Sequence, residues 1–138
     1  MSKKIVITGG LGYIGTELCK IYSGVSWNNE ILVIDNRFIS ERVNQLRNWN
    51  IDFIHGDILD KNLINKYCKD ADIVHHLAGI TDVPRVKSES TDDKDIKIKL
   101  VAEEGTQNVI DSISDKCKII FPSTHIVYEG IEKVKNGI

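Results

Sequence analysis

Five short apolar runs alternate with segments of helical periodicity along the chain, and this alternation limits the possible folds more than any other feature. The runs occupy residues 4–8, 31–35, 51–56, 72–78 and 118–123. The first, second and last are almost continuous Ile, Leu, Val and Phe, which is typical of strands covered on both faces. No Asn-Gly or Asp-Gly turn joins two adjacent runs. This pattern predicts an α/β fold, a doubly wound parallel sheet with helices on both faces and right-handed crossovers.

The segments between the runs carry apolar residues at helical spacing. We expect each to form one apolar face, made of Leu11, Ile14, Leu18, Ile21 and Tyr22 in the first, Ile39, Val43 and Leu46 in the second, Leu63, Ile64 and Tyr67 in the third, and Ile98, Val101, Gly105, Val109 and Ile113 in a longer fourth. Gly105 would let the fourth helix sit close to the sheet.

Composition and charge exclude several classes of protein. The chain has 138 residues, 41% of them apolar, and a formal net charge of -2. These values fit one globular domain, and the basic residues form no stripe that would bind nucleic acid or an anionic membrane. No apolar stretch approaches the roughly 20 residues needed to span a bilayer, and the first run is too short for a signal peptide. Cys19, Cys68 and Cys117 form no CxxC pair, which favours a reducing, cytoplasmic location.

Residues 8–15, with the sequence TGGLGYIG, place four glycines between the first strand and the first helix. In a doubly wound sheet this turn binds a dinucleotide pyrophosphate, because the helix N-terminus offers free N–H groups and a positive dipole end. We expect Gly9 to permit the tight turn, Gly12 to let the phosphates approach the backbone and Gly15 to let the helix pack on the strand. The sequence therefore predicts a Rossmann-type site.

Asp35 ends the second run, twenty residues after Gly15. A carboxylate at this place can accept hydrogen bonds from both adenosine ribose hydroxyls and would repel a 2′-phosphate. Arg37, two residues later, has a guanidinium that could accept a 2′-phosphate. NAD is therefore the favoured cofactor, and NADP stays as the alternative.

Five motifs in order resemble the extended short-chain dehydrogenases, the NAD-dependent epimerase/dehydratase family that includes UDP-glucose 4-epimerase. They are TGGLGYIG, VIDN, GDILD, HHLAGITDVP and FPSTHIVYEG, and together they cover essentially residues 4–130. The resemblance implies four contacts with the cofactor: the pyrophosphate at Tyr13 and Ile14, the ribose at Asp35 and Asn36, the adenine between Asp57 and Ile58, and the nicotinamide half along the backbone of Leu77, Ala78 and Gly79.

The last motif implies a catalytic hydroxyl. Thr124 matches the family's catalytic Ser/Thr, four residues before Tyr128, and would hydrogen-bond the substrate hydroxyl that is oxidised. Ser123 lies beside it at the same strand end, and Tyr128 matches a structural tyrosine of the family rather than its acid/base tyrosine.

Three departures from the family pattern stand in the sequence. Ala102 replaces an Asn that helps to order the active site, and Glu129 is inserted between Tyr128 and Gly130. The family's Tyr-x-x-x-Lys pair, which supplies the base, does not occur at a suitable place in the chain.

The resemblance therefore implies the cofactor-binding portion of a nucleotide-sugar epimerase or dehydratase, which transfers hydride between a sugar hydroxyl carbon and nicotinamide. We expect residues 1–138 to be a truncated NAD(P)-binding domain that lacks the C-terminal substrate domain and is inactive by itself. The full-length protein could form a homodimer. The alternative is a non-catalytic protein of the same fold that senses NAD(P).

No metal site is expected. His75 and His76 are adjacent on a strand, so their side chains point to opposite faces and cannot chelate one ion. Asp92, Asp93 and Asp95 lack the spacing and the glycine of a calcium loop.

Overall fold

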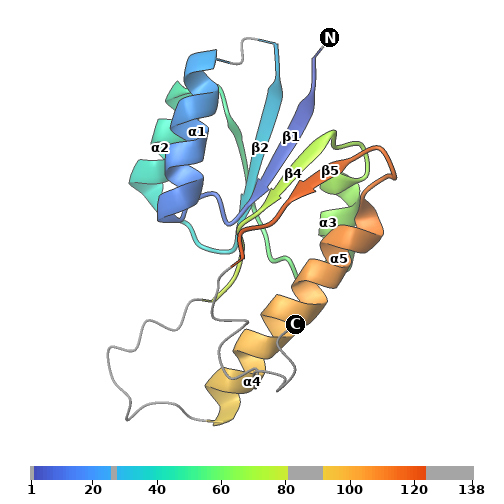
Figure 1. Ribbon diagram of the computed structural model, residues 1–138. Coiled ribbons are helices and arrows are strands. Elements are labelled where there is room, and N and C mark those ends of the chain that lie inside the picture. Colours follow the sequence, from blue (N-terminus) through green and yellow to red (C-terminus); the bar gives the residue numbers. More distant parts are fainter. Residues whose placement is uncertain (1, 26–27, 81–91, 124–138) are drawn as a thin grey trace, which may run out of the picture.

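The computed structural model describes residues 2–25, 28–80 and 92–123 (Figure 1). Its five strands are β1 (Lys4–Thr8), β2 (Glu30–Asp35), β3 (Asp52–His55), β4 (Ile73–His76) and β5 (Lys118–Ile120). All of them pair in parallel, in the order β3-β2-β1-β4-β5. The predicted doubly wound parallel sheet is confirmed.

The helices cover both faces of this sheet. They are α1 (Tyr13–Val25), α2 (Ser40–Asn48), α3 (Lys61–Cys68), α4 (Asp92–Leu100) and α5 (Thr106–Ser112), and a π-helical turn, η1 (Val101–Gly105), joins the last two. Figure 1 shows α1 and α2 on one side of the sheet, α3 and α5 on the other, and α4 projecting past the carboxyl ends of the strands.

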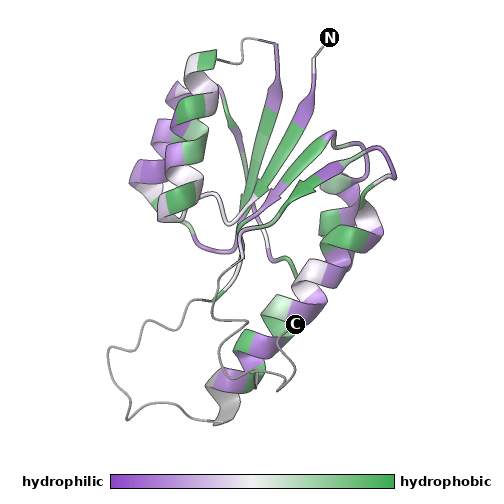
Figure 2. Cartoon of the chain, viewed as in Figure 1, coloured by the Kyte–Doolittle hydropathy of each residue, from purple (hydrophilic) through white to green (hydrophobic). Residues whose placement is uncertain are grey.

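Alternating side chains of the strands build two apolar cores. Ile5, Ile7 and Val33 pack with the first core, under α1 and α2. Val6, Leu32 and Ile34 pack with the second, under α3 and α5. Figure 2 shows the apolar residues concentrated along the central strands. This arrangement follows from the period of two along a strand when both faces are covered.

The expectation for the last run is wrong, because β5 is not covered on both faces. Lys118 and Ile120 are exposed, and Ile119 is half-buried against the core under α3 and α5. Within the described residues β5 pairs with β4 alone. When only one face of a strand is covered, only every second side chain is buried. The apolar composition of this run therefore predicted more burial than the structure shows.

The apolar face expected for the first helix is confirmed for Leu18 and Tyr22, which pack against the first core, and is wrong for Ile14 and Ile21. Leu11 is fully buried, but it precedes α1, and Ile14 and Ile21 are 66% and 62% exposed. The buried positions of α1 are Gly15 and Cys19. A Cβ at residue 15 would lie 2.5 Å from the Cα of Gly10, so this face of the helix must carry a very small residue where it meets the loop. Close packing therefore determined the rotation of α1 more than hydropathy did.

We predict that Gly9→Ala strongly destabilises the fold. Gly9 has a φ of 70°, and a Cβ there would lie 2.7 Å from the backbone N and Cα of Ala78. Left-handed strain costs about 1–2 kcal/mol and overpacking about 1–3 kcal/mol, so we expect a loss of roughly 2–5 kcal/mol in the free energy of unfolding, measured with urea. Gly24→Ala is the matched control. A Cβ at Gly24 meets nothing within 4 Å, and alanine in a helix is more stable than glycine by up to about 1 kcal/mol. Equal stability of both variants would contradict the packing described here.

Candidate functional site

Four loops meet at the carboxyl ends of neighbouring strands. Residues 9–12 follow β1, residues 36–37 follow β2, residues 56–58 follow β3 and residues 77–79 follow β4. The chain leaves β1 toward β2 on one side, while β4 lies on the other, so the strand order reverses at β1. In open α/β sheets, ligands bind in the crevice outside the carboxyl ends at such a reversal. Four of the sequence-predicted segments therefore lie at one place in the fold.

The loop after β1 packs backbone to backbone on the end of β4. The N–H of Gly9 donates to the carbonyl of Ile34 at 2.8 Å, and the N–H of Gly12 donates to the carbonyl of Gly9 at 3.1 Å. The position of a Cβ at Gly9 lies 2.7 Å from Ala78 and 2.9 Å from the carbonyl carbon of Leu77. A tight turn at Gly9 was expected, and its contact with β4 explains why a side chain does not fit.

The glycine spacing indicated no role for Gly10, although the structure shows that no side chain fits there. A Cβ there would lie 2.5 Å from a methyl group of Val33 in β2. Gly15 was expected to bring α1 close to the strand, but its close approach is to Gly10 in the loop. The two glycines pack on each other, because the start of the helix crosses directly over the loop. The pair of adjacent glycines at residues 9 and 10 was the sequence signal that could have indicated this close packing.

Gly12 is different from these glycines, because the space beside it is largely open. The nearest atoms to a Cβ at Gly12 are the carbonyl oxygen of Gly9, at 3.3 Å, and Nη2 of Arg37, at 3.8 Å. Thr16 donates to the carbonyl of Gly12 from both its backbone N–H and its hydroxyl, so Gly12 begins the helical hydrogen bonding. The first N–H groups of an α-helix have no partner within the helix. The bare backbone at Gly12 and the positive end of the α1 dipole therefore lie together.

The Asp35 carboxylate holds the glycine loop in place. It is 3% exposed, its Oδ2 accepts a hydrogen bond from the backbone N–H of Leu11 at 3.0 Å, and its Oδ1 accepts one from the backbone N–H of Arg37 at 2.9 Å. Each carboxylate oxygen keeps further lone pairs, so the expected contact with a ribose stays a prediction. The sequence did not reveal this tie to Leu11.

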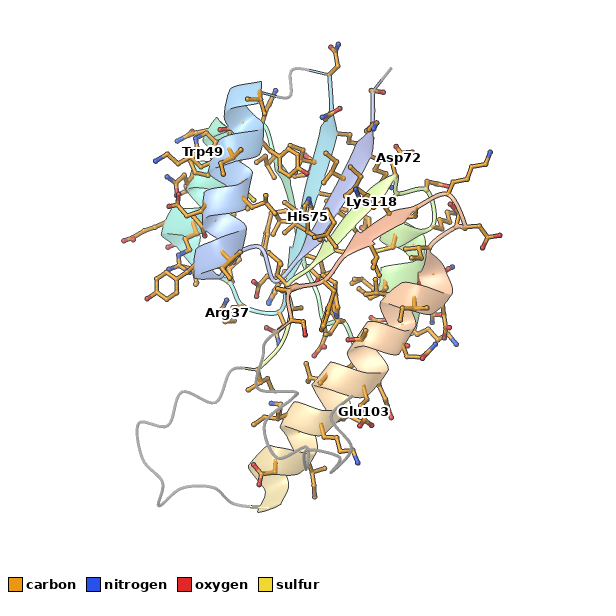
Figure 3. The ribbon with its side chains drawn as sticks, in the orientation of Figure 1. Arg37, Trp49, Asp72, His75, Glu103 and Lys118 are labelled. Atoms are coloured by element: carbon orange, nitrogen blue, oxygen red, sulfur yellow. The ribbon has the colours of Figure 1, made fainter. Side chains whose placement is uncertain are left out.

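Two arginines border the loop. The Arg37 side chain is 55% exposed and its Nε lies 3.4 Å from Oδ1 of Asp35. Arg42, from α2, donates to the carbonyl of Leu11 and lies 5.3 Å over the ring of Tyr13. Figure 3 shows Arg37 at the carboxyl ends of the strands, and Asp72 and Lys118 near the opposite ends. Tyr13 and Ile14, at the start of α1, are 86% and 66% exposed.

The loop after β3 is fixed by the helix that carries Gly105. Ile58 is buried, and its carbonyl accepts a hydrogen bond from the side chain of Asn108 at 2.9 Å. A Cβ at Gly105 would lie 2.3 Å from Cδ1 of Ile58. Gly105 therefore lies against this loop, rather than against the sheet as expected. Asp57 accepts from the N–H of Leu59 at 2.9 Å and is exposed.

The segment after β4 is tied to β1 and to α5. The N–H of Leu77 donates to the carbonyl of Thr8 at 3.1 Å, and the N–H of Ala78 donates to the hydroxyl of Thr8 at 3.2 Å. His76 lies between the hydroxyls of Thr8 and Thr106. Burial lowers its pKa below the ordinary 6.5. Thr8 and Thr106 were missed by sequence reasoning, although each is adjacent to a glycine of interest.

Several predicted residues are not brought into this arrangement. Thr124 and Tyr128 lie outside the described residues, and Ser123 is exposed after β5. His75 points away from His76, and its Nε2 lies 2.7 Å from the hydroxyl of Tyr22 on α1.

In the parts of the chain that the structure describes, no three metal-ligand side chains gather, and no helix has the length and hydropathy needed to cross a membrane.

A hollow lies away from the four loops. It has a volume of about 400 Å³ and opens between β3 and α3, beside Lys4, Glu30, Asp52 and Lys66. These residues stand at the amino ends of the strands and on α3. We favour the carboxyl ends as the functional site, because the close-packed glycines and helix terminus are there.

We predict that Asp35→Ala destabilises the protein more than Asp57→Ala does. The first change leaves the buried N–H of Leu11 without its acceptor, which costs about 1–3 kcal/mol in the free energy of unfolding. Asp57 makes the corresponding type of bond at an exposed position, where water replaces it, and its loss should cost less than about 1 kcal/mol. Urea unfolding of the two variants measures both. If Asp35→Ala costs no more than Asp57→Ala, the carboxylate does not hold the loop.

Comparison with known proteins agrees with this fold. Residues 6–137 match the profile of the 3-beta hydroxysteroid dehydrogenase/isomerase family. The chain is 32% identical over 130 residues to a UDP-N-acetyl-alpha-D-glucosaminuronate decarboxylase from Bacillus cytotoxicus, covering 93% of the chain and 38% of that enzyme. It is 33% identical over 144 residues to a CDP-paratose 2-epimerase from Salmonella typhi, covering 96% of the chain and 40% of that enzyme.

Among solved structures, a UDP-glucose 4-epimerase from Brucella ovis in complex with NAD is similar, with a TM-score of 0.70 and 27% identity. The match covers 92% of this chain and 37% of that one. The chain therefore spans between 37% and 40% of the length of these three relatives.

Proposed function

This chain belongs to the 3-beta hydroxysteroid dehydrogenase/isomerase family, and from that membership we propose that it is the NAD-binding portion of an enzyme acting on nucleotide sugars. The relatives named above are a decarboxylase and epimerases of UDP- or CDP-linked sugars, and one of them was solved with NAD. We propose that the whole protein acts on the same class of substrate, nucleotide sugars, and transfers hydride between a sugar hydroxyl carbon and nicotinamide.

One observation carries the proposal. The loops follow each other across the sheet in the order of the parts of a dinucleotide: the predicted adenine loop after β3, the ribose loop after β2, the pyrophosphate loop after β1 and the nicotinamide segment after β4. The ribose and pyrophosphate assignments come from the residues themselves and those for the adenine and the nicotinamide half from the family resemblance; the strand order is compatible with all four and supports the proposal.

The residues present fit a dinucleotide. At Gly12 a side chain would fill the open space beside the helix terminus, and its absence leaves backbone that phosphates can approach. We propose that Gly9, Gly12, Tyr13, Ile14 and Gly15 form the pyrophosphate subsite, with Asp35, Asn36 and Arg37 at the ribose. Asp57 and Ile58 would flank the adenine, and the backbone of residues 77–79 would border the nicotinamide half. Bound NAD would supply the hydride acceptor.

The chain's own catalytic contribution is proposed to be the Thr124 hydroxyl, with Ser123 beside it, orienting the sugar hydroxyl. A threonine hydroxyl does not serve as the base near neutral pH. The Tyr-x-x-x-Lys pair that the family uses for this step is not in the sequence. We therefore expect residues 1–138, as one NAD(P)-binding domain, to bind cofactor without turnover.

The second candidate is a non-catalytic protein of the same fold that senses NAD(P). Detection of sugar-dependent NADH formation by a longer form of the protein would exclude it. A cytoplasmic location is part of the proposal and is supported by three cysteines that are free in the structure. A homodimer of the full-length protein, and the absence of a nucleic-acid partner, stay predictions.

We predict that Gly12→Val abolishes NAD binding and leaves the fold intact. Gly12 directly precedes α1, and the branched side chain would occupy the flank of the helix terminus that the phosphates approach. The one tight contact of its Cβ, 3.3 Å from the carbonyl oxygen of Gly9, needs a backbone shift of only a few tenths of an ångström. Calorimetry with NAD and circular dichroism measure the two properties. Gly24→Val places the same side chain near the other end of α1, where a Cβ meets nothing within 4 Å, and should bind NAD like the wild type. A folded Gly12→Val protein with unchanged affinity would mean that the glycines serve packing alone.

We predict that the wild-type chain binds NAD more tightly than NADP, because a buried carboxylate at Asp35 repels a 2′-phosphate. Arg37→Ala should weaken the residual NADP binding and leave NAD binding nearly unchanged, since the exposed guanidinium is the cation beside that position. Arg47→Ala, on α2 at an exposed position, is the control. Tighter binding of NADP than of NAD by the wild type would contradict this assignment and give Arg37 the deciding role.

A further inference from the structure

A buried chain of hydrogen bonds joins β1, β4 and α5 through the ring of His76. Nδ1 of His76 lies 2.7 Å from the hydroxyl oxygen of Thr8, and Nε2 lies 3.0 Å from that of Thr106. His76 is 1% exposed, and the ring of Phe121 stacks on it with centroids 5.9 Å apart. The ring is therefore fixed on its face and at both nitrogens.

The direction of these hydrogen bonds follows from counting donors. The backbone N–H of Ala78 can only donate, and its partner is the hydroxyl oxygen of Thr8, at 3.2 Å. The hydroxyl proton of Thr8 then has one acceptor among the described residues, Nδ1 of His76. A neutral ring that accepts at Nδ1 carries its proton on Nε2 and donates it to Thr106. In the opposite tautomer, the Thr8 proton would lack an acceptor in a fully buried place.

The chain of bonds ends on the backbone that borders the glycine loop. Thr8 is followed directly by Gly9, and Ala78 is the residue whose N and Cα lie 2.7 Å from the position of a Cβ at Gly9. A shift of Ala78 by a fraction of an ångström is therefore transmitted to Gly9, because no side chain lies between them.

At its other end the chain is anchored on a helix that also touches the loop after β3. Thr106 is the first residue of α5 and follows the π-helical turn, where Gly105 packs on Ile58. A π-turn accommodates one extra residue in a helix and often occurs at functional sites. Directly after this turn the hydroxyl of Thr106 faces His76, and the same helix holds the carbonyl of Ile58 through Asn108.

We propose that His76, protonated on Nε2, is a positioning residue that holds residues 77–79 against the glycine loop, with Thr106 as its anchor on α5. The inference rests on the NAD-binding function proposed above, and it gives α5 a part in cofactor affinity without a contact to the cofactor.

The test compares NAD affinity in the variants Thr106→Val, Thr106→Ala and Thr106→Ser. Valine has the shape of threonine but no hydroxyl, and alanine removes the hydroxyl without adding bulk. We expect both to weaken NAD binding by about fivefold, the factor that corresponds to a hydrogen bond worth about 1 kcal/mol, and serine to restore it to within about twofold. Ser112→Ala is the matched control, because this buried hydroxyl on the same helix bonds only to the carbonyl of Asn108 among the described residues.

A second measurement needs no variant. Long-range proton–nitrogen NMR of the wild-type chain reports which ring nitrogen of His76 carries the proton, and we expect Nε2. A proton on Nδ1 would overturn the proposal. So would unchanged NAD affinity in folded Thr106→Val and Thr106→Ala while the wild type binds, because the bond would then be structural alone. If the wild type itself binds no NAD, the proposed function fails and the positioning role falls with it.

Discussion

The backbone of Gly9 lies directly against the backbone of Ala78, and the arrangement of the whole site depends on this contact. A Cβ at residue 9 would come within 2.7 Å of two main-chain atoms, which cannot move aside as a flexible side chain can. The contact forces the chain to turn sharply after β1, at a φ of 70°, and so directs the start of α1 over the loop. Gly15 then packs on Gly10, and Gly10 packs on Val33, which determines how α1 is rotated against the sheet.

Two buried polar groups hold this loop from opposite sides. Asp35 holds it to β2 through the N–H of Leu11, and Thr8, with His76, holds it to β4 and α5. Both groups are nearly inaccessible to water, so a lost partner would leave a buried donor or acceptor unpaired. The bare backbone at Gly12 belongs to this loop, and a site made of backbone N–H groups depends on a loop that is held in place.

Sequence reasoning predicted the strands, their parallel direction and the four loops, because hydrophobic runs and glycine spacing are local signals. It did not predict the rotation of α1 or the exposure of β5, since these depend on close approach and on which strand lies at an edge. The bond of Asp35 to Leu11 and that of His76 to Thr106 join residues 24 and 30 positions apart, and no local pattern announces them. The roles of the predicted site residues toward a cofactor stay predictions.

An NMR titration of the isotope-labelled chain with NAD tests the central claim most directly. The account predicts that the amide signals of residues 9–15, 36–37, 57–58 and 77–79 shift together, while those at the amino ends of the strands stay in place. Shifts confined to the hollow beside Glu30, Asp52 and Lys66 would contradict it, and so would the absence of any shift at saturating NAD.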